Sequence, residues 1–236
     1  DKSENNNFKF SLEQLTVKDF SVNYQNIPLR QEYDFTISDS KLKGQFSNKE
    51  YDLNILSSML VNKFDLEGVN YLSSKNANTE IILHVINNPF SLTIKKGKLK
   101  IGDMNFFLEG DYKNSKKDMI NLNIKGNQIQ ISEIFSILPL DYASIKKYSS
   151  EGMFNFDGNL NGEISNKQPL SFFFSFNAKN ATLKDKLNNI QLEKIDLSGT
   201  FNNKEQNLKI INFSALMNDK TMRGNIEVEN FKKPTY

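Results

Sequence analysis

Asp157, Asp196 and His84 are the side chains whose chemistry could support catalysis in this chain. Asp157 lies in "FDGNLNG" and Asp196 in "KIDLSG", and a pair of carboxylates is what glycoside hydrolysis requires. Both aspartates stand beside turns or strand ends, where Asp ordinarily accepts hydrogen bonds from nearby backbone N–H groups. The sequence therefore favours structural roles for both. A glycan-binding or glycan-cleaving β-sandwich is kept as a third functional hypothesis.

His84 is the only histidine, and the chain contains no cysteine. A Ser-His-Asp arrangement would depend on His84, but the strand-like "EIILHVI" predicts that it lies on one face of a sheet. The lack of cysteine excludes thiolate metal sites, disulfides and cysteine nucleophiles. No P-loop, dinucleotide-binding glycine motif, HExxH, GxSxG or EF-hand loop occurs. We therefore expect no enzyme, no catalytic residue, no metal and no cofactor.

The charge pattern gives no footprint for nucleic-acid binding. Thirty Lys and Arg oppose 28 Asp and Glu for a net charge of +2, and the basic residues are scattered singly. Hydrophobic residues make up 38% of the chain, and the mean hydropathy is −0.54, which suits a fold with a thin core. No window of 18 apolar residues and no signal peptide are present. From its opening "DKSENNNFKF" we expect the sequence to be part of a longer protein.

Apolar and polar residues alternate with period two along most of the chain. The pattern is clear in "FKFSL" (8–12), "DFSVNY" (19–24), "NLNIKG" (121–126) and "GNIEVENF" (224–231). It is typical of antiparallel sheets with one wet face. Asn-Lys, Gly-Asp, Asn-Gly and Asn-Asn pairs between the runs indicate hairpin turns. The sequence predicts a mostly β fold of strongly curved antiparallel sheet, forming either a hydrophobic groove or a flattened sandwich.

Two segments depart from this alternation. Residues 52–66 fit a strand or a short helix, and residues 131–148 have the apolar spacing of a helix, interrupted at Pro139. We expect 131–148 to be a helical connector between a first β-sheet region, 1–130, and a second, 149–236. The two regions form either separate units or one continuous domain.

The run "PLSFFFSFNAKNATL" (169–183) concentrates aromatic area on one strand. Alternation directs Phe172, Phe174 and Phe176 to one face and Phe173 to the other. If that face closes on a second sheet, it is a core. If the sheet curls without closing, the face lines a groove in which an acyl chain would gain roughly 0.8 kcal/mol per buried methylene. Alternation alone leaves both arrangements open.

The second half of the chain resembles the C-terminal region of AsmA-like proteins, especially those of the Bacteroidota. The resemblance is carried by "SSEGMFNFDGNLNGEI", "PLSFFFSFNAKNATL" and "LEKIDLSGTFNNKEQNLKIINFSALMNDKTMRGNIEVENFKKP", and it extends over residues 130–234. These are strand-and-turn patterns and include no catalytic signature.

The resemblance implies a non-enzymatic periplasmic domain whose β-groove binds lipid acyl chains. It also implies a parent protein that is anchored in the inner membrane by an N-terminal helix absent from this chain, and that supports phospholipid transport to, or maintenance of, the outer membrane. The partners would be phospholipids or other lipids, with envelope proteins as further candidates. The implied lipid-binding residues are Phe154, Phe156, Leu170, Phe172, Phe174, Phe176, Ile195, Leu197, Phe201, Ile226 and Val228. The alternative function is a structural or protein-interaction module of the cell envelope with a closed β core.

Overall fold

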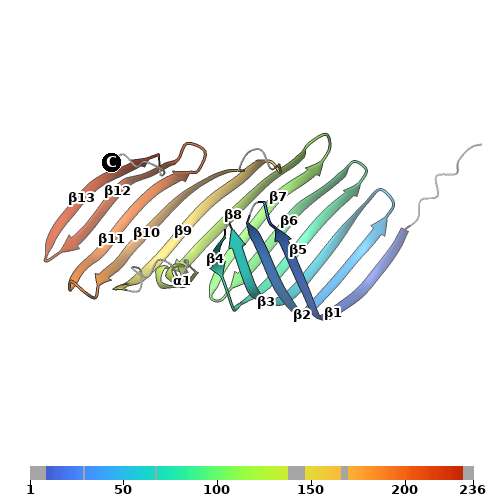
Figure 1. Cartoon of the computed structure of the whole chain (residues 1–236), viewed down its shortest axis with the longest axis horizontal. Coiled ribbons are helices and arrows are strands. Elements are labelled where there is room, and N and C mark those ends of the chain that lie inside the picture. The colour runs from blue at the N-terminus through green and yellow to red at the C-terminus, as the bar shows by residue number, and fades with distance from the viewer. Residues whose placement is uncertain (1–8, 29, 67, 138–146, 166–169, 231–236) are drawn as a thin grey trace, which may run out of the picture.

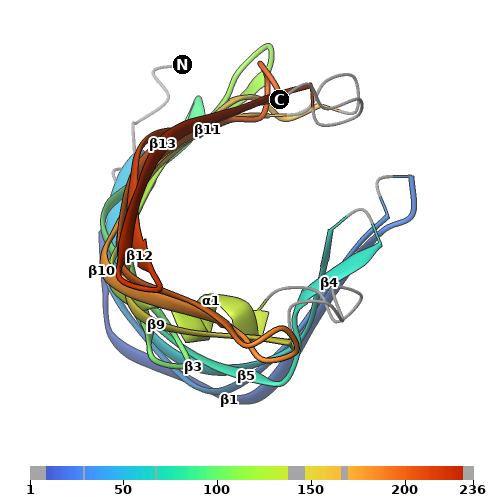
Figure 2. The same cartoon turned by 90° about the vertical axis from the view of Figure 1, so that its left-hand side faces the viewer.

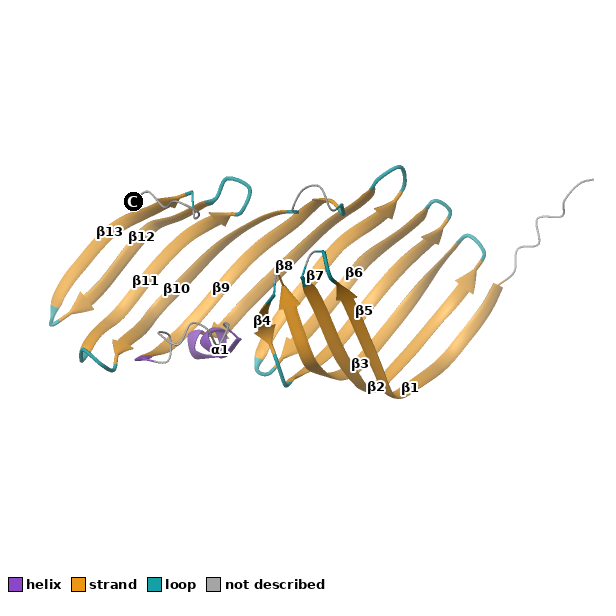
Figure 3. Ribbon diagram, viewed as in Figure 1, coloured by secondary structure: helices purple, strands orange, loops and turns teal. Residues whose placement is uncertain are grey.

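Long alternating runs joined by short turns form the strands of the structure, a computed structural model that describes residues 9–28, 30–66, 68–137, 147–165 and 170–230. Figure 1 and Figure 3 show one curled sheet with a single short helix. The elements are β1 (Lys9–Asn26), β2 (Gln31–Ser47), β3 (Glu50–Leu66), β4 (Val69–Leu72), β5 (Lys75–Asn87), β6 (Phe90–Ile101), β7 (Met104–Asn114), β8 (Asp118–Gln130), α1 (Ile131–Ile137), β9 (Tyr148–Glu163), β10 (Ser171–Asp185), β11 (Ile190–Asn202), β12 (Asn207–Met217) and β13 (Lys220–Glu229).

The strands follow one another across the sheet in chain order. All thirteen belong to one sheet, in which β4 pairs only with β3, and every printed pairing is antiparallel. Short hairpin turns produce this order, because only longer crossovers could connect parallel neighbours. β8 pairs directly with β9, so the sheet continues without a break past α1. The predicted antiparallel β fold is confirmed, and the sheet is open.

The two segments with an irregular pattern are resolved differently. Residues 52–66 form part of the strand β3. The helix expected within 131–148 is present as α1, whereas Leu138, Pro139 and the rest of 138–146 lie outside the described residues.

Figure 2 shows that the sheet curves around a trough, with α1 on the inside of the curve. β-Bulges contribute to this shape, because an extra residue on one strand bends the strand locally. Shifts in register occur between Gly126 and Ile129 and between Ala178 and Ala181. The residues within them, Gln128 and Asn180, have positive φ angles of 53° and 48°.

Side chains from neighbouring strands complete the hydrogen bonding at these bulges. The Asn155 Oδ1 atom accepts the backbone N–H of Gln128 at 2.8 Å. Likewise, Asp196 Oδ1 accepts the backbone N–H of Asn180 at 2.8 Å. The bulges are therefore built into the sheet, since a backbone donor that leaves the ladder needs another partner.

Fully buried apolar side chains are few and mostly small. Ala178, Ala181, Ile195 and Ala215 form the buried cluster, and Ile131 of α1 packs against it. The chain exposes 16091 Å², whereas a compact protein of 27.2 kDa would expose about 10,900 Å². A single curved layer accounts for this larger exposed area, because another element covers only a small part of its apolar face.

Candidate lipid-binding groove

One face of the sheet carries a row of apolar residues that runs from β1 to β13, beside a row on the same face that includes Ser40, Ser57 and Thr79. Residues that pair directly across neighbouring strands form a row on this face. The row consists of Leu15, Leu42, Ile55, Ile81, Gly97, Leu108, Ile124, Gly158, Phe174, Phe201, Leu208 and Val228. Every position is a hydrophobic residue or a glycine, so the row crosses the whole sheet without a polar side chain.

On the opposite face, the adjacent row of paired residues is mostly polar or charged. That row consists of Lys41, Leu56, Glu80, Lys98, Phe107, Lys125, Asp157, Ser175, Thr200, Lys209 and Glu227. Successive residues of a strand point to opposite faces, so the period-two alternation has sorted polar and apolar side chains onto the two sides.

The apolar face is the inner, concave one. Ile131 of α1 packs against Phe154, Leu197 and Phe213 through the buried alanine cluster, and α1 lies inside the curve in Figure 2. We call this inner surface the concave groove. No second sheet lies over it within the described part of the chain, and its lining side chains are mostly half-buried.

Six phenylalanines form a continuous aromatic surface in the groove, which we call the aromatic floor. They are Phe154, Phe156, Phe172, Phe174, Phe176 and Phe201. Phe174 is central, because its ring centroid lies 5.4 Å from Phe172, 5.6 Å from Phe176 and 5.0 Å from Phe201. Such tilted contacts between rings are favourable in their own right, so the floor is held in place by its own packing.

The other residues expected to bind lipid lie around this floor. Leu197 pairs with Ala178 and packs at the buried cluster, and Ile195 is buried within that cluster. Leu170 lies just before β10. The Leu170 side chain is the group nearest to the position that a Cβ atom on Gly162 would occupy. Ile226 and Val228 extend the apolar rows onto β13, where Val228 pairs with Leu208. The structure thus brings ten of the eleven predicted residues onto one face of β9, β10, β11 and β13, with Leu170 just before β10.

The first half of the chain contributes lining residues that the resemblance did not include. Aromatic stacks flank the groove near its first edge, where Phe46 lies 5.2 Å from Phe10 and Tyr33 lies 5.5 Å from Tyr24 between ring centroids. Burial, together with the charge of Tyr24, raises the pKa of Tyr33, as expected for a phenol against an apolar surface. The alternation in "FKFSL" and "DFSVNY" pointed to Phe10 and Tyr24, and the pairing of β1 with β2 brings Phe46 and Tyr33 to them.

The outer, convex face carries cross-strand ion pairs. Lys125 Nζ lies 2.9 Å from Asp157 Oδ2, and Lys209 Nζ lies 2.6 Å from Glu227 Oε1. The hydrogen bond from Lys209 lowers the pKa of Glu227, and the bond to Asp157 raises the pKa of Lys125. These groups are exposed, so each pair adds little to stability. The charged groups instead keep the convex face well solvated.

His84 belongs to this convex face. Its Nδ1 atom lies 2.8 Å from Asp52 Oδ1, which also accepts a hydrogen bond from Lys95 Nζ at 2.7 Å. The bonds from Lys95 and then from His84 lower the pKa of Asp52. Because its pKa is lowered, ionised Asp52 stabilises the folded state at pH values above the pKa of Asp in the unfolded chain. This small stabilisation is lost as the pH falls through the pKa of Asp52 in the folded protein.

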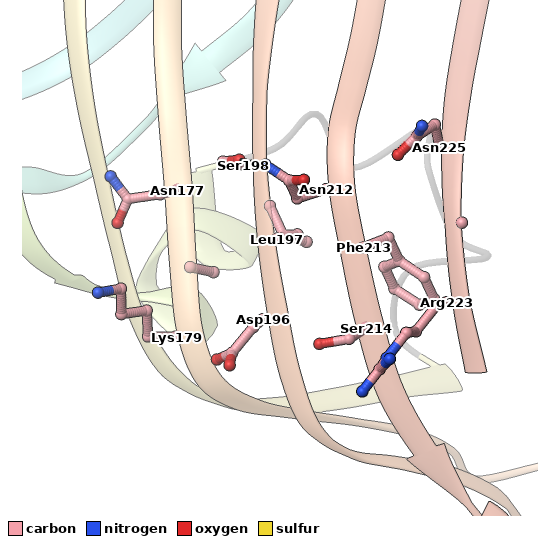
Figure 4. A pocket seen from close by; sticks show the side chains of 12 residues that line it. Asn177, Lys179, Asp196, Leu197, Ser198, Asn212, Phe213, Ser214, Arg223 and Asn225 are labelled. Carbon is pink, nitrogen blue, oxygen red and sulfur yellow. Dashed lines mark hydrogen bonds between the residues drawn. The ribbon is translucent and has the colours of Figure 1, made fainter. Parts of the chain in front are cut away.

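Figure 4 shows a shallow hollow over β10 to β13 that is lined by both polar and apolar side chains, Leu197 and Phe213 among the apolar ones. Lys179, Asp196, Asn212 and Arg223 contribute to its lining. Asp196 is engaged by the bulge at Asn180, and Asn212 Nδ2 donates to Ser198 Oγ at 3.2 Å. Two of the polar groups that border the hollow therefore make hydrogen bonds that hold the sheet together.

The structure does not bring Asp157 and Asp196 together. Asp157 lies on β9 beside Ser175 of β10, which in turn pairs with Thr200 of β11. Asp196 is four residues further along β11, so the two Cα atoms are about 16 Å apart by strand geometry. Glycosidase carboxylates are separated by at most about 9.5 Å. The two residues are not arranged as a hydrolytic pair.

Substitution of each aspartate tests its structural role, which is bulge formation for Asp196 and a surface ion pair for Asp157. Asp196→Ala removes the acceptor of the Asn180 N–H, and we expect it to lower the free energy of unfolding by about 1–2 kcal/mol. Asp157→Ala removes only an exposed ion pair, so the expected loss is below about 0.5 kcal/mol. Urea denaturation of both variants measures the difference. Equal losses would contradict the assignment of Asp196 to the bulge.

Among the described residues, no group of three or more His, Asp or Glu side chains is placed to hold a metal ion. In the same part of the chain no helix has the length and apolarity needed to cross a membrane. Comparison of the chain with protein families, with curated proteins and with solved structures finds no match.

Proposed function

We propose that the concave groove binds the acyl chains of lipids and shields them from water, without catalysing a reaction. The observation that supports this most strongly is the apolar row that crosses the sheet on its open side. An exposed apolar surface of this length is costly to a protein that leaves it empty. An acyl chain matches it in chemistry and in shape.

The energetics favour loose and mobile binding. About ten buried methylenes would gain roughly 8 kcal/mol, and association itself costs several kcal/mol. The row has no polar side chain to fix the position of the ligand along the groove. Acyl chains would therefore bind with little selectivity for their length and could slide across neighbouring strands.

We further propose that the protein is AsmA-like and works in the periplasm, as part of a parent anchored in the inner membrane. In this role it would support phospholipid transport to the outer membrane or the maintenance of that membrane. This part of the proposal rests on the resemblance of residues 130–234. An open groove lined by apolar side chains is consistent with such a role.

The alternative function, a protein-interaction module of the cell envelope, would require an apolar docking patch on the outside of the sheet. The large apolar side chains exposed there include Leu56 at 51%, Phe107 at 43% and, on β10, Phe173 at 44%. Phe173 stands between Asn159 and Asn202 on the neighbouring strands. Singly exposed apolar residues are common on protein surfaces, so the convex face favours this function less than the groove favours lipid binding.

Co-purified lipid tests the proposed function directly. We expect native mass spectrometry of the purified chain to show phospholipid adducts, and organic extracts to contain the same species. A fluorescent fatty acid should bind in the absence of membranes and be displaced by unlabelled fatty acid. The proposal would be refuted if neither a lipid adduct nor displaceable binding of the fatty acid were detected.

A further inference from the structure

The turn between β10 and β11 holds a large apolar side chain out in solvent. Leu187 is 75% exposed and Ile190, at the start of β11, is 49% exposed. In Figure 1 this turn projects from the lower border of the C-terminal half of the sheet, the border on which α1 also lies. Replacing an exposed apolar side chain in a turn with a polar one normally costs the fold no stability. A leucine at position 187 therefore indicates a role other than stabilising the fold.

The turn itself does not require leucine. Asp185 Oδ1 accepts the backbone N–H groups of Leu187 at 2.9 Å and Asn188 at 3.1 Å, and Asn188 Nδ2 donates to Asp185 Oδ2 at 2.8 Å. Asn189 supplies the positive φ angle of 51°. These three hydrogen bonds and the positive φ angle are properties of Asp and Asn in turns. The Leu187 side chain takes part in none of them, and the ordered turn presents it outward.

Cationic side chains stand close to this apolar tip in the sequence and in the fold. Lys184 and Lys186 flank Asp185, and the backbone N–H of Lys186 donates to the Lys147 carbonyl at 2.8 Å. Lys147 in turn places its Nζ atom 5.0 Å from the centroid of the Tyr148 ring. An apolar tip with lysines at neighbouring positions is complementary to a membrane surface, which offers apolar acyl chains beneath anionic head groups.

The same hairpin leads into the concave groove. Leu183 pairs with Leu192 at its base, and both pack against the buried cluster beneath α1. Ile190 is two residues from Leu192 on β11 and therefore shares its face. Ile190 and Leu192 thus lead from the end of the turn to the lining of the groove.

We propose that the β10–β11 hairpin inserts its tip into an anionic lipid membrane and is the place where acyl chains pass between the membrane and the groove. This inference rests on the proposed lipid-binding function of the groove. Leu187 would enter the boundary between head groups and acyl chains, while Lys147, Lys184 and Lys186 would contact anionic head groups.

Vesicle flotation tests the inference with the complete chain. Vesicles of phosphatidylcholine with 30% phosphatidylglycerol should bind the wild type, and vesicles of pure phosphatidylcholine should bind it at least about tenfold more weakly, because lysines near a membrane respond to its surface charge. We expect Leu187→Asp, and separately the double variant Lys184→Glu with Lys186→Glu, to weaken binding to the anionic vesicles at least about tenfold.

Two matched controls isolate this hairpin. Ile27, in the β1–β2 turn, is 76% exposed but is followed by Pro28 and has one cationic residue nearby, Arg30, in place of the lysines of the β10–β11 hairpin. Lys49 and Lys116 lie in the β2–β3 and β7–β8 turns, which carry the same charge without an exposed leucine. Ile27→Asp and the double variant Lys49→Glu with Lys116→Glu should each retain binding to anionic vesicles within about twofold of the wild type.

A vesicle-free assay separates this inference from the function of the groove. Leu187→Asp should bind a fluorescent fatty acid in solution as the wild type does. Absence of vesicle binding by the wild type, equal vesicle binding by Leu187→Asp, an equal loss in the controls, or loss of fatty-acid binding in Leu187→Asp would each overturn the inference. Fatty-acid binding by the wild type in the same vesicle-free assay tests the proposed function separately, because it does not depend on the hairpin.

Discussion

Phe174→Glu is expected to abolish acyl-chain binding while the chain stays folded. The ring of Phe174 contacts Phe172, Phe176 and Phe201 at the centre of the aromatic floor. A carboxylate at this position would have to lose its water when an acyl chain covers it, which is costly for an unpaired charge. We expect fatty-acid affinity to fall at least about tenfold. The free energy of unfolding should fall by only about 1–3 kcal/mol, because the groove is open to water.

Phe173→Glu is the matched control on the same strand. Phe173 points to the convex face, between Asn159 and Asn202, so the same change in charge and volume should leave fatty-acid affinity within about twofold of the wild type. Fluorescence titration and urea denaturation of the two variants measure both effects. Global unfolding of Phe174→Glu would indicate a sealed core in place of an open groove. Equal affinities of the two variants would show that ligand binds elsewhere.

Gly199→Ala is expected to destabilise the sheet by about 2–3 kcal/mol, because the site has no room for a methyl group. A Cβ atom at Gly199 would lie 2.3 Å from the carbonyl oxygen of Lys209 and 2.6 Å from Cζ of Phe176. The backbone of β12 and the ring of Phe176 would both have to move. Since Phe176 belongs to the aromatic floor, fatty-acid affinity should fall together with the urea midpoint.

Gly224→Ala provides the comparison two strands away. A Cβ atom at Gly224 meets nothing within 4 Å, and alanine in a strand loses less backbone entropy on folding than glycine does. We expect this variant to be more stable than the wild type by about 0.5 kcal/mol. A similar loss of stability in both variants would contradict the close packing inferred at Gly199.

Much of the sheet could be predicted from the sequence because strand periodicity is a local property. Alternation assigned Phe172, Phe174 and Phe176 to one face and Phe173 to the other, and the pairings of β10 agree with that division. The turn-forming pairs indicated hairpins and therefore antiparallel neighbours in chain order. The ambiguous segment 52–66 became a strand, because pairing with two neighbouring strands outweighs a weak local preference.

The bulges were not predictable in the same way. Asn180 adopts a positive φ angle within β10, and its backbone N–H is satisfied by Asp196 from the next strand. The side chain that makes the bulge possible is therefore sixteen residues away in sequence. Local pattern suggested that Asp196 bonds a nearby backbone group, and the tertiary structure shows that its partner lies across the strand pair.

The sequence by itself determined the strands, their antiparallel order and the sorting of apolar and polar residues onto two faces. Whether the apolar face is sealed or open depended on the tertiary structure, because the alternation is the same in a sandwich and in a trough. Curvature comes from the accumulated twist, the bulges and the close approach of strands at glycines such as Gly199, which all depend on pairing between distant residues. The hairpin at Leu187 likewise gained significance only when its base was seen to join the lining of the groove.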